Sequence, residues 1–379
     1  MQVLAGISGV VIVLLVLWEA FETIVLPRRV TRQFRFTRLY YRRTWSVWRT
    51  LVAGVRERRL RETLLSYFGP ASLLGLIASW AVMLVLGFGL LNWSLETAAR
   101  SNMPYRGIWT DIYFSGTTFF TLGLGDVTPR SAVGRLLTVL EGGTGFAFLA
   151  LVIGYIPAIY QSFSRRETNI TLLDARAGSP PSAGELLRRH ALDGSLDALN
   201  PWLRDWEGWA ADLLESHLSY PVLCYFRSQH DNQSWLGSLT AVLDTCALVL
   251  VGVDGVARRQ ARLTFAIARH AVVDLAQIFR ARPMAPPRDR LPAERLQELR
   301  RFLGSAGLKL SDGVEAERQL TELRSIYEPY LFALAEAVEV ALPDWMPAAE
   351  HADNWQTSAW GRIGAGGTPP GTSPKADHF

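Results

Sequence analysis

The chain has 379 residues, of which 49% are hydrophobic, and its mean hydropathy is positive at +0.12. This length and composition predict a membrane portion followed by one soluble domain. Two cysteines, Cys224 and Cys246, exclude a disulfide framework and indicate a reducing compartment around the soluble half. The net charge is only +4, so the clustering of the arginines is more informative than their total.

Residues 1–26 predict a transmembrane helix. Val3 to Leu26 is apolar except for Glu19 and Glu22, and a helix of this length extends about 36 Å, enough to cross a bilayer. A signal peptide is the alternative, but no positive charge precedes the stretch and no small-residue cleavage site ends it. We expect Glu19 and Glu22 to anchor the helix end at the interface or to pair with arginine; an ion-path role is the other option.

Residues 27–63 predict an arginine-rich cytoplasmic linker. Twelve arginines lie between Pro27 and Glu62, which by the positive-inside rule places the linker inside and the N-terminus outside. An apolar stripe at helical spacing predicts an amphipathic helix lying on anionic lipid. Its residues are Tyr41, Trp45, Trp48, Val52 and Val55. Nucleic-acid binding is disfavoured because apolar spans flank the segment on both sides.

Residues 64–160 contain two further spans and a shorter segment between them. Leu64 to Leu91 is the second span, with a kink expected at Gly69-Pro70, and Ser131 to Tyr160 is the third. An external loop, 94–106, follows the second span. Gly107 to Gly116 is too short to cross a bilayer, so we expect a helix that enters the membrane and stops there.

The decapeptide Thr117 to Asp126 reads T-T-F-F-T-L-G-L-G-D. Its glycines allow positive φ at little steric cost, so successive carbonyl groups can line one side of the backbone. Rings of such carbonyls can replace the water shell of a cation. A surface turn between helices is the alternative for the decapeptide alone, and the flanking spans count against it.

The stretch from Thr121 to Pro129, T-L-G-L-G-D-V-T-P, resembles the filter of the bacterial potassium-channel pore family, in which T-V-G-Y-G-D is usual. Leu124 replaces the family's tyrosine and removes a hydroxyl that anchors the filter. The resemblance implies K⁺ sites at Thr121, Leu122, Gly123 and Leu124, in a filter that Gly125 and Asp126 complete. It also implies that aromatic, hydroxyl and acidic side chains support this filter. They are Trp109, Tyr113, Phe114, Thr117, Thr118 and Glu141.

The third span resembles the inner, gate-forming helix of that family. Gly145 matches the hinge glycine, although close helix packing is an equal alternative for a small residue in a membrane helix. The candidate gate and cavity residues follow at turn intervals: Phe146, Leu149, Ile153 and Pro157. For Glu141 we expect a hydrogen bond to a pore-helix hydroxyl such as Thr117 or Thr118, or protonation, because an unpaired intramembrane acid is costly.

The remaining residues predict a linker (161–184), a helical cytosolic regulatory domain (185–345) and a largely disordered tail (346–379). The expected helices are Glu185–His190, Trp202–Leu218, Ser219–Gln229, Trp235–Val253, Gly255–Arg280 and Pro292–Leu303, and further helices are expected over Val314–Ala341. The apolar stretch Leu239 to Val253 is short and contains Asp244, which favours a buried core helix over a fourth span. The aromatic run Tyr220 to His230 predicts an interface or a core helix.

The sequence therefore predicts an all-α membrane protein with three spans and a re-entrant pore loop. The resemblance implies a homotetramer in the inner (plasma) membrane that conducts K⁺ passively, with no catalytic site and no cofactor besides the permeant ion. Regulation through an unknown cytosolic ligand is expected, and no nucleic-acid partner. Two alternatives stay open: a weakly selective cation pore, and a membrane-anchored signalling protein with a vestigial pore.

Overall fold

The computed structural model describes residues 1–26, 35–96, 98–101, 107–192, 196–230, 232–256 and 258–347. Residues 27–34, with three of the twelve arginines of the predicted linker, and all but the first two residues of the predicted tail lie outside these ranges. The chain divides into two compact units. Unit 1 contains residues 1–163 and 217–226, and unit 2 contains the rest.

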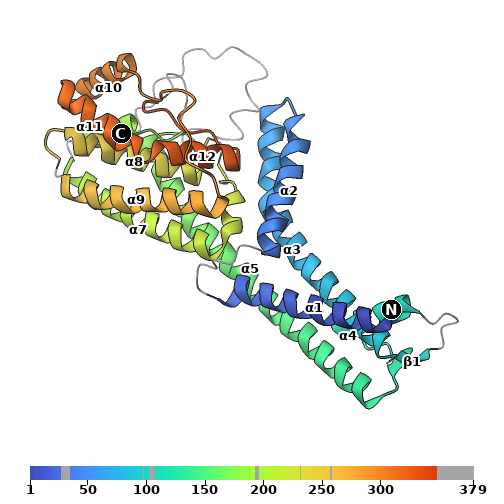
Figure 1. The fold of residues 1–379 in the computed structure, drawn as a ribbon. Helices are drawn as coiled ribbons and strands as arrows, with labels where there is room; N and C mark the ends of the chain where they lie inside the picture. The colour runs from blue at the N-terminus through green and yellow to red at the C-terminus, as the bar shows by residue number, and fades with distance from the viewer. Residues whose placement is uncertain are drawn as a thin grey trace, which may run out of the picture. The chain divides into compact units, whose positions relative to one another are not determined.

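Unit 1 consists of helices and one two-stranded sheet (Figure 1). The elements are α1 (Gln2–Ala20), the π-helical turn η1 (Phe21–Val25), α2 (Phe36–Ala53), α3 (Arg58–Ser94), β1 (Ala98–Ser101), α4 (Ile108–Phe119), β2 (Val127–Pro129), the first part of α5 (Ala132–Ala177) and the 3₁₀ turn η3 (Pro221–Tyr225). The predicted spans correspond to α1, α3 and α5, and the predicted re-entrant helix corresponds to α4. The predicted kink at Gly69-Pro70 falls inside α3, which continues through Pro70.

Helices α1 and α3 pack against each other through glycines. A Cβ added to Gly9 would lie 2.6 Å from the carbonyl oxygen of Gly87, so the two backbones touch at this point. At one end of the pair, the Gln2 amide donates to the Glu96 carboxylate at 2.8 Å. Small residues are typical of close contacts between membrane helices because van der Waals packing replaces the hydrophobic driving force there.

Both acids at the end of the first span bind protein groups. Glu19 accepts hydrogen bonds from the backbone N–H groups of Phe36 and Thr37 at 3.1 and 3.2 Å and from the Thr37 hydroxyl at 2.9 Å. Its carboxylate therefore caps the N-terminus of α2, where unpaired N–H groups favour a negative charge. Glu22 accepts from Trp18 Nε1 at 2.8 Å and lies 3.6 Å from Arg35 Nε, so the predicted pairing with arginine is found at Glu22.

The predicted lipid-facing stripe of α2 is largely buried in protein, which corrects the sequence-based expectation. Tyr41, Trp45 and Val52 are buried, and Trp48 Nε1 donates to the Leu64 carbonyl of α3 at 3.1 Å. Helix α2 thus forms a hairpin with the first part of α3 (Figure 1). The apolar stripe finds aromatic partners in its own chain, which sequence periodicity alone cannot distinguish from lipid.

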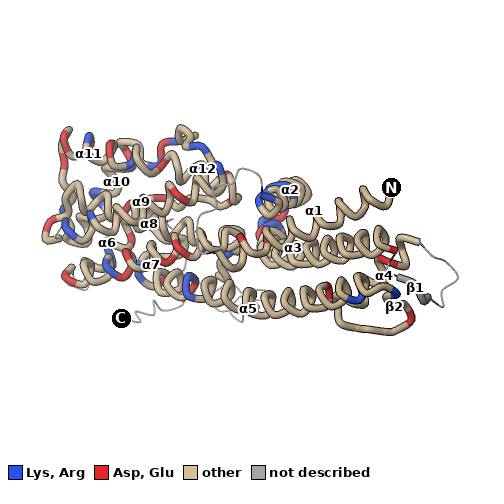
Figure 2. Tube along the Cα trace, turned by 60° about the horizontal axis from the view of Figure 1, so that its bottom comes forward, with Lys and Arg blue, Asp and Glu red and all other residues tan. Residues whose placement is uncertain are grey.

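Unit 2 contains the end of α5 and the helices that follow. They are α6 (Ala183–Leu192), η2 (Leu196–Ala198), α7 (Leu199–Ser219), α8 (Trp235–Gly252), α9 (Arg258–Phe279), α10 (Ala293–Ser305), α11 (Val314–Ser325) and α12 (Glu328–Val338). Charged residues are frequent on these helices, whereas α1 and most of α3 carry few (Figure 2).

Two sequence predictions for this half are wrong in detail. The linker predicted at 161–184 is mostly helix, because α5 continues without a break to Ala177. The helix predicted at Ser219–Gln229 is the short turn η3, since Pro221 cannot continue α7. The helices predicted over Val314–Ala341 are confirmed as α11 and α12, which are separated near Tyr327.

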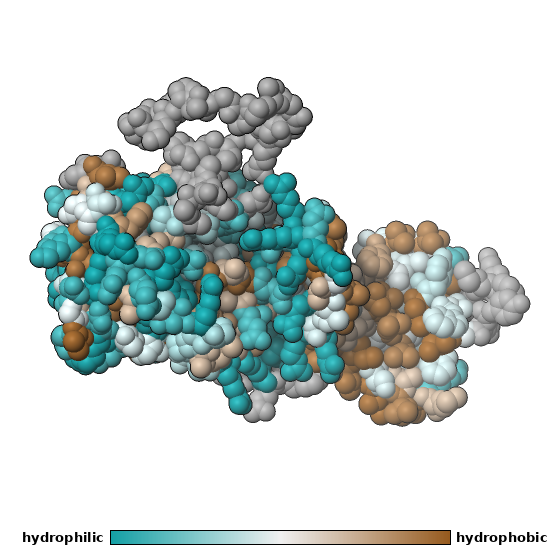
Figure 3. Space-filling model, turned by 90° about the horizontal axis from the view of Figure 1, so that it is seen from above, coloured by the Kyte–Doolittle hydropathy of each residue, from teal (hydrophilic) through white to brown (hydrophobic). Residues whose placement is uncertain are grey.

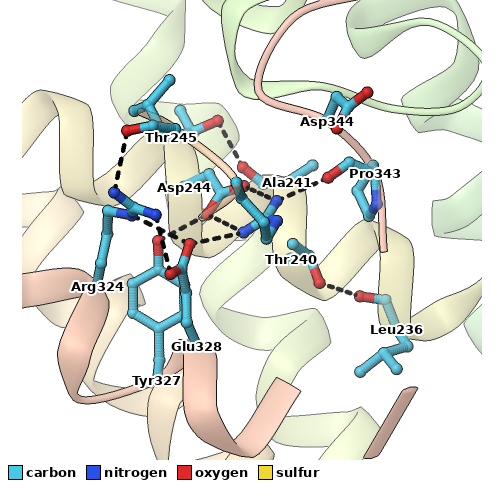
Figure 4. Close-up of polar contacts among 12 residues, drawn as sticks. Leu236, Thr240, Ala241, Asp244, Thr245, Arg324, Tyr327, Glu328, Pro343 and Asp344 are labelled. Carbon is cyan, nitrogen blue, oxygen red and sulfur yellow. Dashed lines mark hydrogen bonds and ion pairs between the residues drawn. The ribbon is translucent and has the colours of Figure 1, made fainter. Parts of the chain in front are cut away.

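Helix α8 is the buried centre of unit 2. Four described helical segments are long and apolar enough to cross a membrane, namely 2–25, α3, α5 and α8. Every residue of α8 is buried inside the protein, as expected for a core helix. Its single acid, Asp244, has protein partners: Arg290 donates to it at 2.6 Å and the Tyr327 hydroxyl at 2.6 Å (Figure 4).

Candidate functional site

The pore-loop candidate begins where α4 ends. The carbonyl of Thr117 accepts from the N–H of Leu122 at 2.8 Å, and the carbonyl of Thr118 accepts from the N–H of Thr121 at 3.0 Å. Carbonyls in the last turn of a helix have no intrahelical donor. Here the backbone of the following loop supplies the donors, which fixes the loop against the end of the helix.

The loop backbone alternates in handedness. Thr121, Gly123 and Gly125 have φ values of +56°, +56° and +77°, whereas the intervening Leu122 and Leu124 are not in the positive-φ region. Alternation of this kind turns successive carbonyl groups toward one side. Nothing lies within 4 Å of a Cβ added to Gly123 or Gly125, so neighbouring residues leave room for a side chain there. The positive φ value is therefore the reason for glycine at both positions.

The end of the loop is held by Asp126. One carboxylate oxygen accepts from the Tyr113 hydroxyl of α4 at 2.8 Å, and the other accepts from the N–H of Val127 at 3.0 Å. Strand β2 then pairs with β1 in an antiparallel register that places Ser101 opposite Val127. The loop is therefore fixed at both ends, at α4 and at the two-stranded sheet.

The side chains predicted to support the loop have different environments in the structure. Phe114 and Thr117 are buried within the subunit, and the Thr117 hydroxyl donates to the Phe114 carbonyl at 2.9 Å. Thr118 contributes its carbonyl to the loop. Trp109 is 78% exposed, so within one subunit it does not join an aromatic support around the loop.

Glu141 of α5 is completely buried behind the loop. Its carboxyl group contacts the Ser115 hydroxyl of α4, and it accepts from the Asn92 amide of α3 at 3.3 Å. The prediction of a pore-helix hydroxyl partner is correct in kind, but the partner is Ser115 and neither of the two threonines named from sequence. Ser115 lies on the side of α4 that faces α3 and α5, a placement that depends on the packing of three helices.

One face of α5 packs in the subunit and the opposite face is open. Glu141, Gly145, Tyr155 and Ile159 are buried. The predicted gate residues Phe146, Leu149, Ile153 and Pro157 are all exposed. The candidate gate side chains therefore share the face of α5 that the rest of the chain leaves uncovered. In the view of Figure 3, apolar residues dominate the surface of the membrane-spanning part of unit 1.

The turn η3 forms a contact that the sequence analysis did not place. The Tyr225 ring lies 6.1 Å from that of Tyr41, 5.1 Å from that of Trp45 and 5.1 Å from that of Phe68. Phe226 packs where Gly69 has no side chain, since an added Cβ would come within 2.7 Å of its ring. The density of aromatic residues from Tyr220 to His230 indicated a contact in the sequence. The partners of these residues follow only from the folded structure.

This aromatic contact also includes α5. The Tyr220 ring lies 5.7 Å from that of Tyr155, and the Phe226 ring lies 5.6 Å from that of Phe163. We call residues 220–226 the aromatic turn. It lies in unit 1, and the chain enters unit 2 directly after it. The turn thus contacts α2, α3 and α5 within one compact unit.

Residues 76–162 match the family model described as an ion channel. The chain is also 27% identical over 191 residues to an uncharacterized membrane protein, YdjJ, of Bacillus subtilis (strain 168). That match covers 48% of this chain and 52% of the relative, so the chain spans about half the length of the curated relative it matches. No solved structure matches the chain. The family match and the apolar helices together identify a multi-pass membrane protein.

Proposed function

Since residues 76–162 match the family model described as an ion channel, we propose that the chain is a member of the bacterial pore-type ion channels and forms a K⁺-selective channel. The observation that carries the proposal is the backbone of Thr121 to Gly125, in which residues of positive φ alternate with others directly after a short membrane helix. Carbonyls turned to one side can replace the hydration shell of a cation, and several sites in series permit passive conduction. No cofactor or catalytic group is needed.

A homotetramer is part of the proposal. Leu122 and Leu124 are each 63% exposed in the subunit, and the neighbouring Thr121, Gly123 and Gly125 are also exposed. Irregular backbone at membrane depth is tolerated only where protein buries it or where it lines a water-filled cavity. One subunit supplies one side of such a cavity, and closed symmetry around a shared axis supplies the rest.

We propose selectivity for potassium, and we weigh it against a weakly selective cation pore. Leu124 replaces the tyrosine usual in the family, but the Tyr113–Asp126 hydrogen bond fixes the outer end of the loop from α4. This support favours a filter of defined diameter. A weakly selective cation pore is the second candidate, and the absence of a hydroxyl at position 124 is the observation that favours it.

We further propose that the gate lies on the open face of α5 and that unit 2 regulates it. Helix α5 continues into unit 2, and the aromatic turn contacts α5 immediately before the chain enters unit 2 a second time. A ligand that binds unit 2 can shift the gate only to the extent that it prefers one arrangement of these elements.

Anionic lipid is the proposed partner of the outer face of α2. Arg42, Arg43 and Arg49 are exposed there together with Val47 and Leu51. Apolar side chains between arginines suit a membrane surface with negative head groups. We place this surface on the cytoplasmic side of the plasma membrane, in agreement with the positive-inside rule.

Flux measurements on the purified protein in liposomes test the proposal. Reversal potentials under opposed K⁺ and Na⁺ gradients should follow the K⁺ gradient. Gly123→Val should abolish the flux and leave the oligomer intact, because only the positive-φ geometry is lost. Gly107→Val is the matched control: its φ of 171° suits any residue and nothing lies within 4 Å.

Two outcomes would contradict the proposal. Equal permeation of Na⁺ and K⁺ would favour the weakly selective pore. Full K⁺ flux through an intact Gly123→Val oligomer would remove the filter assignment, and a vestigial pore would give no flux in either protein.

A further inference from the structure

The carboxyl group of Glu141 lies where three membrane elements meet. On α3, Val85, Gly89 and Asn92 share the face that packs against α4, and a Cβ added to Gly89 would lie 3.0 Å from Cα of Ile112. Helix α5 brings Glu141 to the same place. The Ser115 hydroxyl lies 2.8 Å from the Val85 carbonyl oxygen and also contacts one carboxyl oxygen of Glu141.

The number of hydrogens that these groups can donate determines whether Glu141 is protonated. The Val85 carbonyl can only accept, and the Ser115 hydroxyl has one hydrogen. Both contacts of Ser115 are satisfied when its hydrogen goes to Val85 and Glu141 donates a hydrogen to the Ser115 oxygen. The Asn92 amide then donates to the other oxygen of Glu141. This arrangement requires a protonated, neutral Glu141.

The charges around the site agree with a neutral acid. Within the described ranges no arginine or lysine pairs with Glu141, and its side chain is completely buried. A buried carboxylate without a cation is costly, and intramembrane acids either find a partner or lose their charge. Asp111, one turn before Ser115, is a second buried acid and supplies no positive charge.

We propose that neutral Glu141 is a positioning residue that donates a hydrogen bond to Ser115 and thereby holds the inner helix α5 to the pore helix α4 and the outer helix α3. The inference deepens the proposed channel function and rests on it. Because α4 also supplies the carbonyls that hold the filter loop, a movement of α5 at the gate would be transmitted to the filter through this contact.

Infrared spectroscopy tests the protonation state without any need for flux. The difference spectrum between the wild-type protein and Glu141→Gln at neutral pH should show the loss of one protonated carboxyl C=O band. A difference confined to the carboxylate region would overturn the proposal. This result is independent of whether the protein conducts K⁺, so a failure of the channel assignment does not obscure it.

Flux in liposomes tests the positioning role. Glu141→Gln, whose amide can donate to Ser115 and accept from Asn92, should keep most of the K⁺ flux. Glu141→Ala and Ser115→Ala should each lower it about tenfold, since each leaves buried polar groups unpaired, and the double variant should be no worse than either. Thr138→Ala is the matched control, because its hydroxyl bonds only to the Gly134 carbonyl of its own helix.

Two results would contradict the positioning role. If Glu141→Gln lost as much flux as Glu141→Ala, the negative charge and not the donated hydrogen would be essential. If Glu141→Ala and Ser115→Ala matched the Thr138→Ala control in flux and in oligomer yield, the contact would have no role in holding the filter.

Discussion

Gly145 of α5 lies directly against Phe119, the last residue of the pore helix α4. A Cβ at position 145 would sit 2.0 Å from the Phe119 carbonyl oxygen, well inside any possible contact. The sequence left two interpretations of this glycine open, a gating hinge and close packing. The structure gives a packing reason, and α5 is helical on both sides of it.

We predict that Gly145→Ala displaces the end of α4 and with it the filter loop. The K⁺ flux should fall at least about tenfold, because overpacking of a tight contact costs about 1–3 kcal/mol. Gly143→Ala is the matched control in the same helix, since nothing in the subunit lies within 4 Å of its added Cβ. Flux and oligomer yield in liposomes are the measurements.

A hinge would produce a different pattern. If α5 bent at these glycines, alanine at either position would stiffen the helix and impair gating. Gly145→Ala and Gly143→Ala would then lose flux to a similar extent, and the filter would stay well packed in both. Normal flux in Gly145→Ala would contradict the packing role.

The orientation of the chain gives a second prediction. The arginine-rich α2 should be cytoplasmic and the end of α3 external, so a membrane-impermeant thiol reagent added to intact cells should label Glu96→Cys and leave Thr50→Cys unlabelled. Both positions are exposed, and the native Cys224 and Cys246 are buried and give little background. Labelling of position 50 from outside would reverse the topology.

The aromatic turn gives a third prediction. Tyr225→Ala should weaken the attachment of the turn to α2 and α3 by about 2–3 kcal/mol, less than the cost of removing a fully buried aromatic ring, because Tyr225 is only partly buried. Open probability in single-channel recordings should change while the K⁺ to Na⁺ ratio stays the same. Tyr67→Ala, which removes an exposed tyrosine beside Phe68, is the control.

Removal of unit 2 provides the complementary measurement. A chain that ends near Arg166 should still conduct, with altered open probability or a less stable tetramer. Wild-type gating and assembly in both the truncated chain and Tyr225→Ala would mean that unit 2 serves something other than the channel.

The spans and the filter loop could be predicted because their signals are local. Long apolar runs are dictated by bilayer thickness, and the φ values of Thr121, Gly123 and Gly125 follow from a short motif. The partners of side chains at the ends of these runs could not be predicted. Glu19 caps α2 and Trp45 packs on Phe68, and both contacts depend on how separate helices meet.

The soluble half shows the same limit. The buried state of α8 followed from its length and its single acid, Asp244. Its partners Arg290 and Tyr327 lie far away in the chain, in segments whose sequences give no sign of a shared site.

Glu185 makes the stability of unit 2 sensitive to acid. Burial alone would raise the pKa of this carboxyl, but hydrogen bonds from Arg188 and Arg189 at 2.6–2.7 Å outweigh it and lower the pKa below the usual 4.5. A lowered pKa in the folded state gives stability that is present above about pH 4.5 and is lost as the pH falls through the folded value.

We therefore predict that Glu185→Gln destabilises unit 2 by about 2 kcal/mol at pH 7, the range for hydrogen bonds to charged groups. The difference from the wild-type protein should shrink as the pH is lowered below 4.5. Urea unfolding followed by the fluorescence of the buried tryptophans of α7 measures it. A difference that stays constant down to pH 3 would exclude the charged contact as its cause.

The last prediction concerns Arg290, a buried cation of unit 2. It donates to Asp244 at 2.6 Å, to Glu328 at 3.1 Å and to the Pro343 carbonyl at 2.8 Å, and its guanidinium lies 5.6 Å from the Trp345 ring. Figure 4 shows Asp244, Tyr327 and Glu328 converging on this cluster. These contacts join α8, α12 and the segment after α12.

Arg290→Met should destabilise unit 2 by about 3–5 kcal/mol, because it leaves the buried carboxylate of Asp244 without its cation, whereas Glu328 keeps its pair with Arg324 at 3.1 Å. Arg288→Met is the matched control: Arg288 is 71% exposed and its pair with Asp344 at 3.6 Å should contribute less than about 1 kcal/mol. The urea midpoint of unit 2 measures both. Replacing Asp244 by Asn in the Arg290→Met protein should recover part of the loss, since the unpaired charge and not the missing side-chain volume is the main cost. Equal stability of the Arg290 and Arg288 variants would mean that packing around α8, and not this ionic cluster, holds the segment after α12 in place.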